Sequence, residues 1–127
     1  MTKVSPCHFR TAYVAHNSGH DMSALKEFCD KIVFCSSGYE GEEDLPQVLT
    51  DAIKDFDPEK DVVVPVGNVS SNILLGVAIA RKAFHLEAGA DGIPVPVVQF
   101  SAALYANKEY RFREIILGRE SSNASQD

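Results

Sequence analysis

Two hydrophobic periodicities alternate along this chain, and their order is what most constrains the fold. Five short apolar runs have the length and composition of strands: residues 9–15, 31–35, 61–66, 95–100 and 110–117. Three intervening segments carry helical spacing or a helix-start signal: residues 21–29, 42–56 and 72–84. Strands that alternate with helices in this way predict an α/β fold with a mostly parallel sheet and helices on both faces.

The third strand and the last one indicate how the sheet is ordered. The continuous run Val62-Val63-Val64 is typical of a strand covered on both faces. Residues 102–108 form a connection too short for a helical crossover, so the last strand is expected antiparallel to the fourth, at the sheet edge. Right-handed crossovers favour the order 2-1-3-4-5, although Pro65 and Pro96 leave it open.

The whole pattern predicts a three-layer Rossmann-like or flavodoxin-like sheet of about five strands. We expect one α/β domain over residues 5–118, followed by a polar C-terminal tail over residues 119–127.

Charge and hydropathy narrow the classes of function. The formal net charge is -6, and residues 42–60 contain seven acidic side chains but only two basic ones. This excess argues against direct nucleic-acid binding and indicates a solvated helix face, a surface for a basic partner, or a nucleic-acid mimic. The longest apolar run, residues 73–80, is about half of what a bilayer span needs, and no apolar segment follows the N-terminus. We therefore expect neither a membrane span nor a signal peptide.

The cysteines point to a reducing compartment. Cys7, Cys29 and Cys35 are odd in number and form no C-x-x-C pair, which disfavours a disulfide framework and a structural zinc site. Cys29 and Cys35 lie among apolar residues and are expected to be small buried side chains.

Three polar loops follow the first three strands: residues 16–21, 36–39 and 67–72. In the predicted order they meet at the carboxyl ends of the strands, where open α/β sheets bind ligands. The third loop opens a helix whose free amides attract anions, so we expect a small anionic ligand. The alternative is that Ser70 or Ser71 merely caps the helix. The candidate ligand-binding residues are His16, Asn17, Ser36, Ser37, Gly67, Asn68, Ser70 and Ser71.

Catalysis is a separate hypothesis, and it depends on the first loop. His20 and Asp21 have the chemistry of a general acid and base near neutral pH, and Ser18, Ser36 or Ser37 would be the nucleophile. In the alternative, Asp21 caps a helix and His20 has a structural role. No dinucleotide or P-loop motif is present, and His16, His20 and Asp21 lack a diagnostic metal spacing, so no cofactor or metal is predicted. Tyr39 and Tyr105 either stack on a base at the rim or cover the core edge.

Two segments, 17–24 and 31–38, carry a resemblance. The first reads Asn-Ser-Gly-His-Asp-Met-Ser-Ala and the second is an apolar strand that ends at Gly38. Asp57-Pro58, the strand 62–66, the small-residue helix 74–83 and Tyr110 follow in order. Over about residues 12–117 this pattern resembles small uncharacterised Rossmann-like proteins encoded by tailed bacteriophages, with Met22 in place of an aromatic residue. The resemblance implies a phage setting, in the host cytoplasm or the virion, and brings no activity or catalytic residue with it.

Three functions follow as hypotheses. The first is a module that binds a small anionic or nucleotide-like ligand and, in a phage, sequesters or alters a host nucleotide signal. The second is a virion or interaction component, a homo-oligomer or a partner of a phage or host protein, acting through the acidic helix from Glu42 or the edge of the last strand. The third is a hydrolase or glycosyl-transferring enzyme on a nucleotide-like substrate, with His20 and Asp21 as acid or base.

Overall fold

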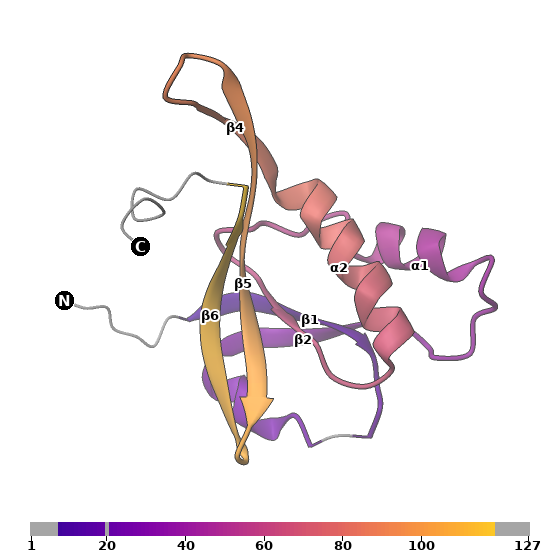
Figure 1. The fold of residues 1–127 in the computed structure, drawn as a ribbon. Coiled ribbons are helices and arrows are strands. Elements are labelled where there is room, and N and C mark those ends of the chain that lie inside the picture. Colours follow the sequence, from indigo (N-terminus) through magenta and orange to yellow (C-terminus); the bar gives the residue numbers. More distant parts are fainter. Residues whose placement is uncertain (1–7, 20, 119–127) are drawn as a thin grey trace.

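The computed structural model describes residues 8–19 and 21–118, which form an α/β fold around one mixed sheet (Figure 1). Its elements, in chain order, are β1 (Phe9–His16), the 3-10 helix η1 (Ser23–Glu27), β2 (Cys29–Ser36), α1 (Leu45–Ala52), β3 (Val62–Val64), α2 (Val69–Ala83), β4 (Phe84–Ala88), β5 (Pro94–Ala106) and β6 (Glu109–Leu117).

The sheet order is β2-β1-β3-β5-β4, with β6 also paired to β5. β2, β1, β3 and β5 are parallel neighbours, whereas β4 and β6 run antiparallel to β5. The predicted placement of the first strand between the second and third is confirmed, and so is the antiparallel pairing of the last strand with the one before it. β4 was not predicted, because it follows α2 directly, without a turn residue such as Gly or Pro between the helix and the strand.

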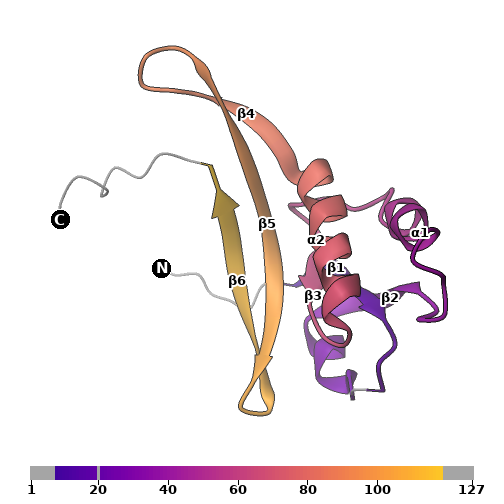
Figure 2. The same cartoon turned by 45° about the vertical axis from the view of Figure 1, so that its right-hand side comes forward.

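The two faces of the sheet are covered differently. α1 and α2 pack on one face, where Leu49, Ile53 and Ile79 meet Tyr13 and Val63. The other face is covered by η1 and by the β5–β6 ribbon, which curls toward it (Figure 2). The ring of Phe112 in β6 lies 5.4 Å from that of Phe9 and 4.9 Å from that of Phe28. Among the described residues this second face carries no α-helix. The prediction of helices on both faces of the sheet is therefore wrong.

The helix expected over residues 21–29 is only a five-residue 3-10 helix. β2 begins at Cys29, earlier than the predicted Lys31, because the amide of Phe9 already bonds the carbonyl of Phe28 at 2.7 Å. A longer helix would need Cys29, which instead belongs to β2 and pairs with Phe9 of β1.

The prediction that residues 102–108 form a connection is also wrong for most of these residues, which belong to a strand. β5 continues to Ala106, and the turn consists of Asn107 and Lys108, both with positive φ (53° and 66°). Two successive residues of positive φ match the right-handed twist of a tight hairpin, so both strands stay paired up to the turn.

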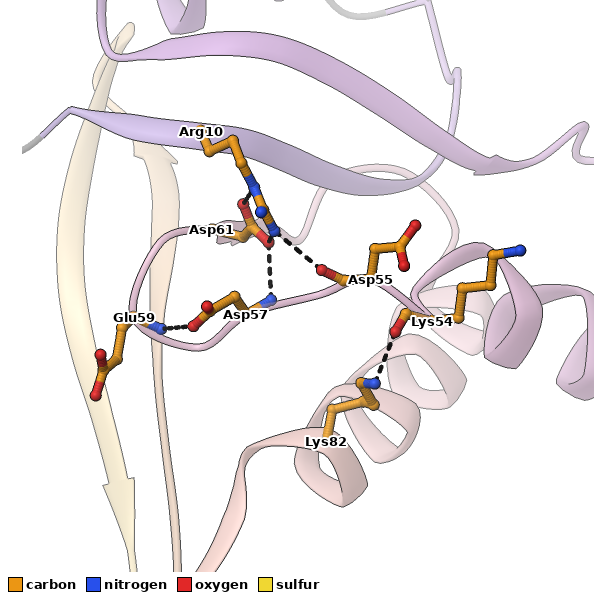
Figure 3. Close-up of polar contacts among 7 residues, drawn as sticks. All are labelled: Arg10, Lys54, Asp55, Asp57, Glu59, Asp61 and Lys82. Carbon is orange, nitrogen blue, oxygen red and sulfur yellow. Dashed lines mark hydrogen bonds and ion pairs between the residues drawn. The ribbon is translucent and has the colours of Figure 1, made fainter.

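A buried carboxylate fixes the amino ends of β1 and β3 (Figure 3). Asp61, at 0% side-chain exposure, accepts hydrogen bonds from Nε and Nη2 of Arg10 at 3.0 and 2.7 Å and from the amide of Asp57 at 2.8 Å. Arg10 Nη2 also donates to the carbonyl of Asp55 at 2.9 Å. Nearby, Lys82 Nζ donates to the carbonyl of Lys54 and ties the end of α2 to the turn that follows α1. One side chain of β1 thus holds the α1–β3 loop and β3 together.

Substitution Asp61→Asn should lower the free energy of unfolding by about 2–4 kcal/mol, because the charge that pairs with Arg10 is removed and one of two buried accepting oxygens becomes an NH2 donor. Urea unfolding followed by circular dichroism measures the change. Glu59→Gln removes the same charge from an exposed side chain of the same loop, and its effect should stay within about 0.5 kcal/mol. Equal effects of the two substitutions would contradict the anchoring role.

The expected burial of Cys29 and Cys35 is confirmed, and both thiols are free. Burial raises the pKa of Cys35 to about 12, and it also raises the pKa of Cys29, whose Sγ lies 3.1 Å from the carbonyl of Leu25. Cys7 lies outside the described residues, as does the predicted tail over residues 119–127.

In the native protein at about pH 8, Cys29 and Cys35 should resist alkylation by iodoacetamide, because only the thiolate reacts. Cys35 would be a thiolate in only about one molecule in ten thousand at that pH, given a pKa of about 12. Peptide mapping by mass spectrometry checks this, with urea-unfolded protein as the fully labelled control. Rapid native labelling of Cys35 would show that its site opens to solvent.

Candidate functional site

The three polar loops come together around the imidazole of His16. His16 ends β1, and its Nε2 accepts a hydrogen bond from the amide of Asn68, after β3, at 3.1 Å. A Cβ at Gly67 would lie 3.1 Å from His16 Nε2, and one at Gly38, after β2, would lie 3.6 Å from His16 Nδ1. The ring therefore lies between two glycines of positive φ that leave room for it.

A cavity of about 270 Å³ opens at this point, and we call it the His16 cavity. It lies at the carboxyl ends of the parallel strands, at the switch point between β1 and β3, where the sequence predicted a site. The volume is just under the range of about 300–1,000 Å³ usual for small-molecule sites, so it suits part of a mononucleotide rather than a dinucleotide. Its lining residues are His16, Gly38, Glu40, Glu42, Leu45, Asn68, Ser70 and Ser71.

The hydrogen bond from Asn68 assigns the tautomer of His16. Because Nε2 accepts the amide proton, the neutral ring carries its own proton on Nδ1. Nδ1 is the nitrogen on the side of Gly38. His16 can therefore donate a hydrogen bond from Nδ1 while its other nitrogen holds the start of the loop before α2.

Glu40 gives the cavity a fixed negative charge that the sequence reading missed. Its carboxylate accepts the amides of Ser37 at 3.0 Å and Gly38 at 3.2 Å. These bonds, led by that from Ser37, hold the pKa of Glu40 below its usual value. Glu42 lines the same cavity. The signal was available in the sequence, since both glutamates flank Gly41 directly after a loop already singled out.

The start of α2 forms the opposite wall. The side chain of Asn68 caps the helix, with its Oδ1 accepting the amide of Ser71 at 2.9 Å, so neither serine is the N-cap. Asn72 Nδ2 donates to the carbonyls of Val66 and Asn68 and holds the loop onto the helix. Ser70 is exposed at the cavity, whereas Ser71 is buried. The wall thus combines a serine hydroxyl with the positive end of the helix dipole.

Several predicted site residues do not line the His16 cavity. The Ser36 hydroxyl is buried and donates to the carbonyl of Ala15 at 2.9 Å, and the Ser37 hydroxyl accepts the amide of Tyr39 in a tight turn. Asn17 and Asp21 line a different cavity of about 600 Å³ beside η1, together with Lys26 and Lys31. We call this second space the η1 cavity.

The proposed acid–base pair is not assembled by the described residues. Asp21 accepts the amide of Ser23 at 2.9 Å, which lowers the pKa of this carboxyl and gives it a turn-capping role. His20 lies outside the described residues. Among residues 8–19 and 21–118, no group of three or more His, Cys, Asp or Glu side chains is placed to hold a metal ion. No helix in the same range is long and apolar enough to cross a membrane.

The two tyrosines weighed as rim residues lie in different places. Tyr39, at 92% exposure, stands between two residues that line the His16 cavity. Tyr105 lies near the β5–β6 turn, with its ring 4.9 Å from that of Tyr110. Only Tyr39 is therefore within the loop that borders the candidate site.

A larger cavity of about 690 Å³ lies between the end of α2, the loop before β3 and β5. Its lining includes Asp57, Lys82 and Glu114, and none of the predicted site residues. It is at the amino end of β3, opposite the end where open α/β sheets bind ligands. We therefore place the candidate site at the smaller His16 cavity, where polar groups of three loops converge.

Comparisons with known proteins found no match: no family model, no curated protein and no solved structure matches the chain.

Substitution Gly67→Ala should destabilise the protein by about 1–3 kcal/mol, because its φ is +92° and the new Cβ would press on His16 Nε2 and on Ser18 Cβ, 3.0 Å away. Gly19→Ala is the matched control, since its φ is +88° but a Cβ there meets nothing within 4 Å. The difference between the two unfolding free energies isolates the packing on His16. Identical values would show that the ring is not held at Gly67.

Proposed function

We propose that this chain is a binding module for a small ligand that carries both hydroxyl groups and an anionic group, of the nucleoside monophosphate kind. One observation supports this most strongly: a single cavity joins the carboxylates of Glu40 and Glu42 to the start of α2 at Asn68 and Ser70. Carboxylates accept hydrogen bonds from sugar hydroxyls, and a helix start attracts phosphate.

The charges of the cavity orient the proposed ligand. An anionic group next to Glu40 would be repelled, because Glu40 is held ionised by the amides of Ser37 and Gly38. The phosphate is therefore placed at the α2 wall, with Ser70 as hydroxyl donor, and the sugar at the glutamates. His16 lines the same cavity and can donate from Nδ1, and the exposed ring of Tyr39 is available to stack on a base.

The fold supports the proposal by where it puts the cavity. We propose a reduced three-layer Rossmann-like architecture in which η1 and the curled β5–β6 ribbon replace the second helical layer. In such sheets the ligand lies at the switch point, here between β1 and β3. The phage setting, in host cytoplasm or virion, is part of the proposal through the sequence resemblance alone.

Isothermal titration calorimetry with adenosine 5′-monophosphate tests the assignment. Glu42→Gln and Ser70→Ala should each weaken binding about tenfold, since the first replaces a charged acceptor with a weaker neutral one and the second removes a hydroxyl donor. Glu42 and Ser70 are exposed, so both variants should keep the stability of the parent chain.

Ser23→Ala serves as the control, because Ser23 lines the η1 cavity instead. Separate titrations with adenosine and with inorganic phosphate measure the binding free energy of each half of the ligand, the first at the glutamates and the second at the start of α2. Binding that Ser23→Ala weakens, while Glu42→Gln and Ser70→Ala leave it unchanged, would move the site to the η1 cavity. No heat with any of the three probes would reject the ligand class.

A further inference from the structure

β4 is an exposed edge strand on an arm of the molecule. It ends the sheet order and pairs with β5 along one side, from Phe84 opposite Val98 to Ala88 opposite Pro94. In Figures 1 and 2 the β4–β5 hairpin rises away from the helices and from β1–β3. The side chains of Phe84 and Leu86 are 52% and 60% exposed. Apolar edge strands of this kind are templates for pairing with another strand.

Two prolines determine which backbone groups this edge presents. Pro96 and Pro94 of β5 lie opposite Leu86 and Ala88 and have no N–H to donate, so these pairs are not hydrogen-bonded ones. The amide of Gly89, which bonds the carbonyl of Ile93 at 3.0 Å, continues the same alternation. His85 and Glu87 therefore direct their backbone groups to β5. Leu86 and Ala88 direct theirs, with the carbonyl of Phe84, to the outer edge.

We propose that two copies of this chain associate through β4, edge to edge and antiparallel, about a two-fold axis at Leu86. In this register each Leu86 exchanges two backbone bonds with Leu86 of the second copy. Each Ala88 amide donates to the carbonyl of Phe84 across the interface. The sheet then continues from one copy into the other, which removes the exposed edge.

The side chains of β4 suit pairing with β4 of a second copy. With Leu86 on the axis, His85 stands opposite Glu87 of the other copy, and Glu87 opposite His85. These two side chains already form a pair at 2.7 Å within one strand, on the face opposite Phe84 and Leu86. On that other face Leu86 meets Leu86, and the large Phe84 meets the small Ala88. The segment is thus complementary to itself in size and in the pairing of His85 with the Glu87 carboxylate, as a two-fold interface requires.

Sedimentation velocity tests the association, with concentration raised to about 1 mM because a short strand interface gives modest affinity. The parent chain should reach twice its mass of 13.9 kDa. Leu86→Pro removes an outward amide that β5 does not use, so the arm should persist while the dissociation constant rises about a hundredfold. Leu86→Ala keeps the amide and should weaken association less. A monomer at every concentration, or a Leu86→Pro dimer as tight as the parent, would overturn the proposal.

A charge exchange tests the register and does not depend on a proline being tolerated. In a homodimer, His85→Glu places two carboxylates opposite each other, and Glu87→Lys replaces the carboxylate that faces His85 with an ammonium donor, so each variant alone should dimerise much more weakly than the parent. Mixed in equal amounts, the two variants place the new carboxylate opposite the new ammonium and keep the original His85 opposite Glu87, so they should form a one-to-one dimer. If both variants dimerise alone as tightly as the parent, or if the mixture stays monomeric, β4 is not paired in this way.

Discussion

The rest of the structure depends on a carboxylate that has no access to water. Asp61 is charged and fully buried, and Arg10 of β1 together with the Asp57 amide is what makes this burial tolerable. An unpaired charge at that depth would cost several kcal/mol, so the α1–β3 loop is tied to β1 whenever the chain is folded. The pairing of β1 with β3, from Ala12 opposite Val62 onward, follows from this tie.

The same tie sets what happens at the other end of these strands. Because β1 and β3 run parallel from a common anchor, His16 and the Gly67-Asn68 turn reach the same edge of the sheet. At the amino end the polar groups of Arg10, Asp57 and Asp61 bond one another, whereas the carboxyl end holds glutamates, a serine and an imidazole that line a cavity. Structural and binding roles are thus separated along two strands, and the fold alone would not choose the ligand.

The sequence allowed the central strands and the meeting of the three loops to be predicted, because apolar runs and parallel order fix both. It did not reveal β4, since the helical pattern of α2 passes into Phe84 without a turn residue. It also placed Ser36 and Ser37 in the site, whereas one hydroxyl is buried and the other holds a turn. Such outcomes depend on turn geometry, which periodicity does not encode. Glu40 was missed although it directly follows one of the three polar loops.

The central claim is that the cavity around His16 is a ligand site. An amide nitrogen–proton NMR titration of the isotopically labelled protein with adenosine 5′-monophosphate tests it most directly. The account predicts saturable shifts that are largest at Gly38, Gly67 and Ser70, on three different loops that share only this cavity or its histidine. Shifts concentrated at Lys26 and Lys31, in the η1 cavity, would contradict it. An unchanged spectrum at saturating ligand would do the same.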